Sequence, residues 1–211
     1  MFVREVEFED INKTLCIYQE NEGDVGCVVW DAALVAAKYL ERHREKPEKN
    51  VVAGCSVVEL GAGTGFLGLA AALLGASQVT ITDLPEFVHL MEKNIKENRH
   101  IVQDQVKAKV LEWGNKEHID AIDKPKVILV ADCIYYEQSL EPLISTLRSI
   151  SGSHTTILLS YEERTSGNKL HLQKKFFELM DQYFTKTKIP IEDHHEVYSS
   201  DEIHLYKFCL K

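Results

Sequence analysis

Strands and helices alternate along most of this 211-residue chain, and this alternation limits its fold more than any other feature. Short apolar runs predict strands at Ser56–Leu60, Gln78–Thr82, Gln105–Val110, Lys126–Ala131 and Thr155–Ser160. Helical periodicity predicts helices at Phe66–Leu74, Pro85–Arg99, Leu140–Ile150 and Lys169–Phe184. Because parallel strands need crossover connections of this kind, the pattern predicts an open α/β sheet with helices on both faces.

The two ends of the chain depart from this alternation. Val3–Phe8 and Thr14–Gln19 alternate in polarity and predict a hairpin, and Trp30–Arg44 predicts a helix. Lys186–Ile189 and Ile203–Leu210 are strands with no helix between them, so we expect an antiparallel hairpin at one sheet edge. The prediction is a Rossmann-like α/β fold in one domain. A seven-stranded, mostly parallel core (51–211) follows an N-terminal hairpin and helix (1–50).

Composition narrows the class of protein. The net charge is −9, which argues against binding to a nucleic-acid backbone. No apolar run reaches the ~18 residues of a membrane helix, and the charged N-terminus does not resemble a signal peptide. The five scattered cysteines and the absence of zinc-ligand spacing favour buried thiols in a reducing compartment, the cytoplasm. His194 and His195 are interpreted as part of a solvated turn.

The strongest local motif is VVELGAGTGFLG, residues 57–68. A buried strand runs into Gly61, Gly63 and Gly65 and then into a helix. Glycine permits positive φ and lets a ligand approach the backbone, and the helix N-terminus adds partial positive charge. This segment predicts a nucleotide-binding loop.

Two cofactor classes match this loop. Gly63, Gly65 and Gly68 satisfy the dinucleotide pattern G-x-G-x-x-G, with Asp83 about 20 residues further on, so NAD is one possibility. Read from Glu59, the same residues spell E-x-G-x-G-x-G, the nucleotide loop of S-adenosylmethionine-dependent methyltransferases. An acid at position 59 suits a cationic sulfonium compound better than a pyrophosphate, which favours the second class.

Three further residues lie at predicted strand ends or helix starts near this loop. Asp83 ends the second strand and can accept hydrogen bonds from both ribose hydroxyls or cap the next helix. Trp113 follows the third strand, where an indole can form one wall of an adenine slot. Trp30 precedes the first helix and can serve the cofactor or pack in the core.

The segment ADCIYYE, residues 131–137, carries the second constellation. Asp132 ends the fourth strand and Tyr135 follows three positions later. A carboxylate can orient an amine, and an aromatic wall can hold its alkyl chain and the growing methylammonium. A lysine amine, with an ordinary pKa near ~10.4, must lose a proton before it attacks a methyl group. The segment Tyr161–Arg164 follows the fifth strand and either touches the substrate or forms a polar surface loop.

Taken together, these blocks resemble the seven-β-strand protein-lysine methyltransferases, the fold group of class I methyltransferases. The resemblance rests on GCVVWDAA, VVELGAGTG, the strand end at Asp83, LEWG and ADCIYYEQSLEPL, in the same order across nearly the whole chain. The segment before the first strand is short, which leaves open any substrate contact made by a longer N-terminal arm.

The resemblance implies a role for each matching residue. S-adenosylmethionine, released as S-adenosylhomocysteine, would be bound by Trp30, Glu59, Gly61, Ala62, Gly63, Asp83, Trp113 and Ala131. Asp132 and Tyr135 would line the methyl-transfer channel, with Tyr136 and Tyr161 contacting the substrate.

The segments VGCVVWDAA, AKVLEWG and ADCIYYEQSLEPL also resemble those of family members that methylate valosin-containing protein, a hexameric AAA ATPase, which is therefore the expected partner. We expect a monomer that uses no metal. Three alternatives stay open: methylation of another protein or a small-molecule amine, a nicotinamide oxidoreductase, and a catalytically silent cofactor-binding module.

Overall fold

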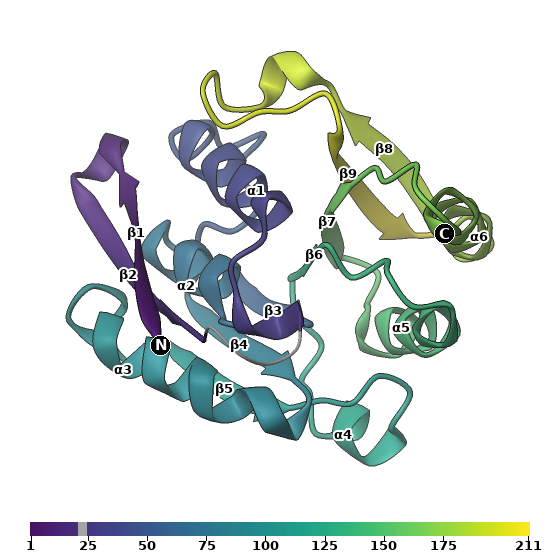
Figure 1. Ribbon diagram of the computed structural model, residues 1–211, viewed down its shortest axis with the longest axis horizontal. Coiled ribbons are helices and arrows are strands. Elements are labelled where there is room, and N and C mark those ends of the chain that lie inside the picture. Colours follow the sequence, from purple (N-terminus) through teal and green to yellow (C-terminus); the bar gives the residue numbers. More distant parts are fainter. Residues whose placement is uncertain (21–24) are drawn as a thin grey trace.

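A seven-stranded sheet forms the centre of the computed structural model, which describes residues 1–20 and 25–211 (Figure 1). Its strands are β3 (Ser56–Leu60), β4 (Gln78–Asp83), β5 (Val106–Val110), β6 (Val127–Ala131), β7 (Thr156–Glu162), β8 (Phe184–Ile189) and β9 (Ile203–Leu210). They lie in the order β5-β4-β3-β6-β7-β9-β8. Every neighbouring pair is parallel except the two that involve β9. The predicted α/β fold and its antiparallel edge hairpin are confirmed.

Helices cover both faces of this sheet (Figure 1). One face carries α1 (Asp31–Arg42), α2 (Phe66–Leu73) and α3 (Val88–Val102), and the other carries α4 (Lys116–Asp120), α5 (Glu137–Ile150) and α6 (Lys169–Met180). Successive strand residues point to opposite layers: Val57 packs with the first group and Val58 with the second. This double burial explains why the central strands are continuous apolar runs rather than alternating ones.

The order of the strands places a crevice at the carboxyl end of β3. The chain passes from β3 to β4 and β5 at one edge and then returns to form β6 on the other side of β3. The loops that follow β3 and β6 therefore diverge toward opposite faces. Open α/β sheets bind ligands at such a reversal of strand order.

The N-terminal hairpin, β1 (Phe2–Phe8) and β2 (Lys13–Gln19), packs on α3 outside the main sheet. Two buried asparagines one helical turn apart on α3 pair with the free edge of β2. Asn94 accepts from the Tyr18 N–H (2.8 Å) and donates to its carbonyl (3.0 Å), and Asn98 does the same for Cys16 (both 2.9 Å). Their amides thus act as a substitute strand and protect an otherwise open edge.

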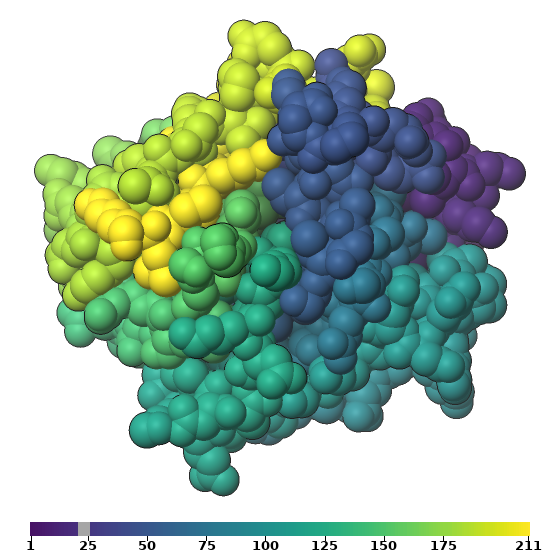
Figure 2. All heavy atoms as spheres, turned by 180° about the vertical axis from the view of Figure 1, so that it is seen from behind, coloured from purple at the N-terminus to yellow at the C-terminus, as the bar shows by residue number. Residues whose placement is uncertain are grey.

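From the opposite side of the molecule, α1 lies between this hairpin and the C-terminal strands (Figure 2). The hydroxyl of Ser160 in β7 donates to the carbonyl of Ala32 in α1 (2.7 Å), and Arg42 donates to the carbonyl of His194 (2.6 Å). The N-terminal helix is therefore an integral part of one layer, and its first residues come to the carboxyl edge of the sheet.

Some predicted boundaries are wrong. The helix expected to run to Phe184 ends at Met180, and Phe184 begins β8. Phe176, Met180 and Phe184 are spaced four apart, which imitates one helix face, but Phe184 is a buried strand residue. The fifth predicted strand extends to Glu162 because Tyr161 and Glu162 pair with β9. The short helix α4 was not predicted.

The surface assignments also need correction. His194 was expected in a solvated turn, but it is 3% exposed because Arg42 holds its loop against α1. The described residues form no disulfide; Cys27 and Cys133 are buried, whereas Cys209 is exposed. Within residues 1–20 and 25–211, no cluster of three or more His, Cys, Asp or Glu is suited to a metal ion. In the same ranges, none of the helices has the length and apolar character needed to span a membrane.

Candidate active site

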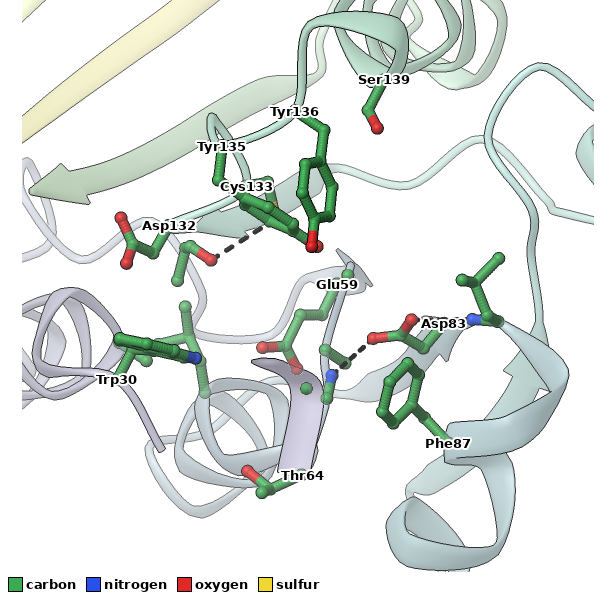
Figure 3. A pocket seen from close by; sticks show the side chains of 18 of the residues that line it. Trp30, Glu59, Thr64, Asp83, Phe87, Asp132, Cys133, Tyr135, Tyr136 and Ser139 are labelled. Carbon is green, nitrogen blue, oxygen red and sulfur yellow. Dashed lines mark hydrogen bonds between the residues drawn. The ribbon is translucent and has the colours of Figure 1, made fainter. Parts of the chain in front are cut away.

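A cavity of about 490 Å³ opens at the carboxyl ends of β3, β4 and β6 (Figure 3). Its lining combines the loop after β3, the ends of β4 and β6 and the start of α1. Its volume falls in the range of roughly 300–1,000 Å³ that is typical of small-molecule sites. The crevice predicted from strand order is therefore a real cavity.

Bare backbone forms the floor of this cavity. Gly61 and Gly63 have φ values of 63° and 53°, in the left-handed region that favours glycine. A Cβ on Gly63 would lie 2.5 Å from the Gly26 carbonyl oxygen, and one on Gly61 would lie 2.7 Å from the Cys133 sulfur. Both the backbone conformation and the packing therefore require glycine, and a ligand can approach the loop closely.

Two carboxyl groups, that of the buried Glu59 and that of the partly buried Asp83, hold this loop in place (Figure 3). Glu59 is completely buried and accepts a hydrogen bond from the Gly68 N–H (2.8 Å), and burial raises its pKa to about 8. Asp83 accepts from the Gly63 N–H (2.6 Å) and the Leu84 N–H (2.7 Å). Burial raises the pKa of Asp83, and the two N–H donors partly oppose that rise. The floor is thus an acidic, preorganised surface.

Aromatic side chains form the walls. Trp113 and Phe87 line the cavity near the ends of β5 and β4, and Trp30 lines it at the start of α1. Tyr135 and Tyr136 face each other edge to face, with ring centroids 4.6 Å apart. Trp30 and Tyr136 are 40% and 44% exposed, so they mark the opening of the cavity.

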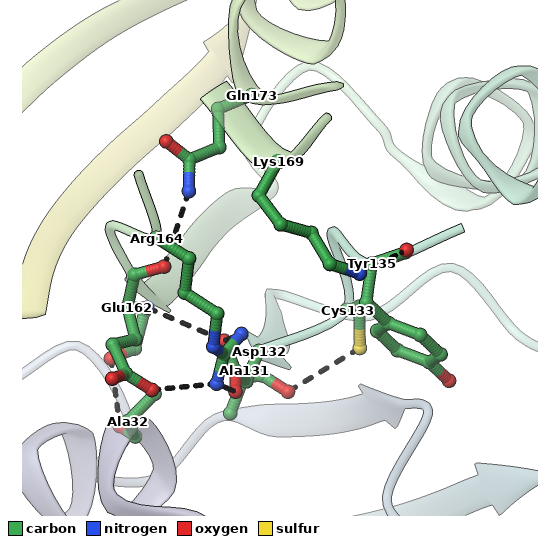
Figure 4. A network of polar contacts seen from close by, with 10 residues as sticks. Ala32, Ala131, Asp132, Cys133, Tyr135, Glu162, Arg164, Lys169 and Gln173 are labelled. Atoms are coloured by element: carbon green, nitrogen blue, oxygen red, sulfur yellow. Dashed lines mark hydrogen bonds and ion pairs between the residues drawn. The ribbon is translucent and has the colours of Figure 1, made fainter. Parts of the chain in front are cut away.

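The opposite end of the cavity from Asp83 carries an ionic network around Asp132 (Figures 3 and 4). Asp132 has a φ of 55° and a side chain that is only 6% exposed. Arg164 donates to both of its oxygens, at 3.0 and 2.6 Å, and also to Glu162 at 2.6 Å. The Glu162 N–H donates to Asp132 as well, at 3.3 Å. This carboxylate is therefore held by a bidentate guanidinium rather than left free in the cavity.

The loop after β6 is fixed by two more contacts. Lys169 at the start of α6 donates to the Tyr135 carbonyl (2.7 Å). The Cys133 thiol lies against the carbonyls of Leu60 and Ala131, at 3.6 and 3.4 Å. Burial raises the pKa of Cys133 well above that of an ordinary thiol, so it stays protonated and serves packing rather than nucleophilic attack.

The sequence of this chain matches a known family over most of its length. Residues 9–183 match the family model described as "Lysine methyltransferase". The chain belongs to the lysine methyltransferase family. This methyltransferase is 35% identical to the mouse (Mus musculus) protein N-lysine methyltransferase METTL21A over 95% of its own length and 85% of the relative. It is also 33% identical to the EEF1A lysine methyltransferase 3 of Xenopus tropicalis, over 90% and 77%.

Solved methyltransferase structures share the fold. The S-adenosylmethionine complex of the glycopeptide N-methyltransferase MtfA superimposes with a TM-score of 0.62 and 14% identity, covering 82% of this chain and 94% of MtfA. The ribosomal protein L11 methylase of Lactobacillus delbrueckii subsp. bulgaricus gives 0.56 and 17%, covering 85% and 77%. At these identities the comparison establishes the architecture alone.

S-adenosylmethionine is the cofactor of this methyltransferase, which excludes the nicotinamide alternative. The described residues fit it. Glycine at positions 61 and 63 lets the loop pack against Cys133 and Gly26 where a Cβ would clash, and the carboxyl groups of Glu59 and Asp83 suit a ligand that carries a sulfonium and a ribose but no phosphate. The aromatic walls suit an adenine ring.

Eleven of the twelve predicted site residues line the cavity together. They are Trp30, Glu59, Gly61, Ala62, Gly63, Asp83, Trp113, Ala131, Asp132, Tyr135 and Tyr136. Their placement agrees with the sequence analysis, and the role of each one stays a prediction.

Tyr161 is the exception. It was expected to contact the substrate, but its side chain is 6% exposed, lies outside the cavity lining and packs between Phe177 and Tyr206 in the core. Tyr161 lies within β7 rather than beyond its tip, and its side chain points to the α6 layer. From the same segment, Arg164 reaches the cavity instead.

Phe87, Cys133 and Lys169 are among the lining residues that sequence reasoning missed. Phe87 could have been suspected, because it follows Asp83 in the loop after β4. Cys133 lies inside the predicted ADCIYYE block but was treated as an ordinary thiol. Lys169 carries no local signal, since it reaches the cavity only through the packing of α6 beside the loop after β6.

Proposed function

We propose that this enzyme transfers a methyl group to the ε-amine of a lysine in a non-histone protein, with valosin-containing protein as the expected substrate. S-adenosylmethionine supplies an electrophilic methyl group and leaves as S-adenosylhomocysteine. The observation that carries the proposal is the opening beside Asp132, framed by two exposed aromatic rings, Trp30 and Tyr136. A long alkylamine fits such an opening, because its chain can pack on rings while its nitrogen reaches inside.

The two ends of the cavity have different roles in this proposal. The donor end consists of Glu59, Gly61, Gly63 and Asp83, which bind the nucleoside and amino-acid parts of the cofactor. Asp83 is the group proposed for the ribose hydroxyls, because its oxygens already lie at the floor. Trp113 and Ala62 would hold the adenine side, and Ala131 would contribute backbone near the methyl group.

The acceptor end consists of Asp132, Tyr135 and Arg164. Asp132 and nearby backbone carbonyls orient the incoming amine, and Tyr135 walls the channel against water. We assign Asp132 an orienting role, since both of its oxygens already accept hydrogen bonds. The proton of the amine would leave to solvent through the open mouth.

The substrate itself is open to a second proposal. Valosin-containing protein is expected from the sequence blocks at Trp30, Trp113 and Asp132. A relative that is 33% identical is named for EEF1A, which supports EEF1A as the second candidate. We propose further that residues 1–211 act as one catalytic domain, as a monomer, in the cytoplasm.

A methyl-transfer assay with labelled S-adenosylmethionine tests these proposals. The recombinant enzyme is incubated separately with valosin-containing protein, with EEF1A and with a lysate, and labelled sites are mapped by mass spectrometry. We expect label on lysine in one purified protein and none with the Asp132→Ala variant. Label confined to small molecules, or none in any sample while the cofactor binds, would refute the protein-lysine assignment.

A further inference from the structure

Arg164 holds a central position in the acceptor end (Figure 4). Its guanidinium bridges Asp132 and Glu162, and its central carbon lies 5.6 Å from the centre of the Trp30 ring at the cavity mouth. The hydrogen bond to Asp132 raises the pKa of Arg164, so the group is permanently charged. In the part of the chain that the structure describes, Arg164 is the only cation within ion-pair distance of Asp132.

The net charge around Asp132 and Glu162 depends on Arg164. Asp132 and Glu162 contribute two negative charges, and Arg164 contributes one positive charge. Lys169 is nearby, but its ammonium is directed at the Tyr135 carbonyl rather than at either acid. Removal of Arg164 would therefore leave two adjacent carboxylates, one of them almost fully buried, without their cation.

An uncompensated carboxylate pair would oppose methyl transfer. A nearby anion stabilises the charged form of an amine, so it would favour ammonium, which has no lone pair for attack. The same anions would strengthen the binding of the sulfonium cofactor relative to its product S-adenosylhomocysteine, because the positive charge moves from the sulfur to the amine nitrogen during transfer. The first effect withholds the nucleophile, and the second makes the preference for the cationic cofactor a measure of the charge at the acceptor end.

We propose, on the basis of the methyl-transfer function proposed above, that Arg164 is a positioning residue that neutralises Asp132 and so sets the charge of the acceptor end. Its bidentate contact also fixes the Asp132 rotamer. Arg164 acts through Asp132 and does not itself touch the reacting atoms. The sequence of its segment, Tyr161–Arg164, does not reveal this ion pair, because Asp132 lies 32 residues earlier in the chain.

The inference is tested by comparing two ligands that differ in charge. S-adenosylmethionine carries the sulfonium, and S-adenosylhomocysteine has the same adenosine and amino-acid parts without it. Calorimetry at pH 7.5 gives both dissociation constants for the wild type, Arg164→Gln and Arg164→Lys. The measured quantity is the preference for the cationic ligand, the ratio of the S-adenosylhomocysteine constant to the S-adenosylmethionine constant.

We expect Arg164→Gln to raise this preference about 3- to 10-fold, because loss of one positive charge favours a nearby cation by roughly one pKa unit. Arg164→Lys should restore most of the wild-type preference, since it keeps the charge. Arg99→Gln is the matched control. It removes the arginine of another 2.6 Å ion pair, with Asp104 on the surface, and should leave the preference unchanged.

Glu162→Gln is a second variant, whose effect on the preference should have the opposite sign. It also tests the inference if Arg164→Gln does not fold. It removes one acid and should lower the preference for the cationic ligand. Equal weakening of both ligands by Arg164→Gln would overturn the inference, since it would make Arg164 an anchor for the cofactor's amino-acid end or a structural residue. An unchanged preference in both variants would overturn it as well. Failure of the wild type to bind either ligand would instead refute the proposed function.

Discussion

The donor and acceptor ends of the cavity are built by different means. The donor end is a stretch of backbone fixed by carboxylates, and all its parts lie within residues 59–83. The acceptor end is a set of side chains whose charges meet across 32 residues, between the loop after β6 and the segment after β7. The first has a shape that only glycine permits, whereas the second has a charge balance that several substitutions can alter. Shape should control cofactor binding, and charge should control transfer.

The largest effect should come from substitution of Asp132, which should reduce methyl transfer far more than it changes cofactor binding. Asp132→Ala removes the group that we propose orients the amine, and it leaves Arg164 paired with Glu162 alone. We expect turnover to fall at least ~100-fold, since small misplacements of a reacting group cost about that much. Affinity for S-adenosylhomocysteine, which lacks the sulfonium charge, should change less than about 3-fold, because the donor end keeps all its hydrogen bonds.

Single-turnover methyl transfer and calorimetry on the same preparation measure the two quantities. Asp104→Ala is the control, because it removes a carboxylate from an equally short ion pair on the surface. A variant of Asp132 that methylates at the wild-type rate would remove this residue from the proposed mechanism.

The next effect concerns the shape of the donor end. Gly63→Ala places a Cβ 2.5 Å from the Gly26 carbonyl, at a φ of 53°. Left-handed strain and overpacking together cost about 3 kcal/mol, so affinity for S-adenosylmethionine should fall about 100-fold. Gly54→Ala is the matched control: its φ is 68°, but nothing lies within 4 Å of the added carbon.

For Gly54→Ala we expect only about 1 kcal/mol lost from the free energy of unfolding, with cofactor affinity unchanged. Calorimetry and thermal melts measure both properties. If the two alanine variants bind the cofactor equally well, close approach of Gly26 does not shape the site.

These two ends also differ in how well they could be predicted. Gly61, Gly63 and Asp83 line the cavity, because a strand, a tight turn and a helix are local features with a recognisable spacing, and their contact with the cofactor stays a prediction. Tyr161 lies outside the cavity lining, because β7 continues two residues further than predicted through pairing with β9. That added pairing is a tertiary contact, and it changes which residues of the segment reach the tip.

The same reasoning explains the errors in the fold. The parallel sheet followed from alternation along the chain, whereas the end of α6 did not, since Phe184 keeps the helical spacing of Phe176 and Met180. The Asp132–Arg164 pair is a further case. Each residue carries a charge, but only the folded sheet brings the two loops together.

A third prediction concerns the pH dependence of stability that the donor end creates. Burial raises the pKa of Glu59 to about 8 from 4.5, so the folded state retains a proton that the unfolded state releases above pH 4.5. The resulting stabilisation is complete below pH 4.5 and is lost as pH rises toward 8. The size of this loss is on the order of 5 kcal/mol.

Glu59→Gln should therefore flatten the decline of melting temperature between pH 5 and pH 8, while it keeps an acceptor for the Gly68 N–H. Asp83 contributes in the same direction, because burial raises its pKa too, so some slope should remain. Melting curves for both proteins across this window provide the measurement. Parallel curves would mean that Glu59 is ionised in the folded protein.

The smallest effect tests whether Asn94 of α3, which pairs with the N-terminal hairpin, also supports the donor end. Asn94 and Asn98 each form two hydrogen bonds with β2, but Asn94 also donates to the carbonyl of Thr64 in the glycine loop (2.9 Å). Asn98 instead donates to the carbonyl of Asn94 within α3 (2.8 Å). The pair therefore differs mainly in contact with the cofactor loop.

Replacing either asparagine by alanine should lower the free energy of unfolding by about 2 kcal/mol, because buried backbone groups of β2 lose their partners. Only Asn94→Ala should also weaken S-adenosylmethionine binding, by about 3- to 5-fold, since one hydrogen bond contributes about 1 kcal/mol. Thermal melts test whether both variants lose the same free energy of unfolding, and calorimetry then measures the difference in their affinity for S-adenosylmethionine. If both variants weaken binding to the same extent, the hairpin acts through general stability. If Asn94→Ala alone weakens binding, then Asn94 of α3 holds the glycine loop that shapes the donor end.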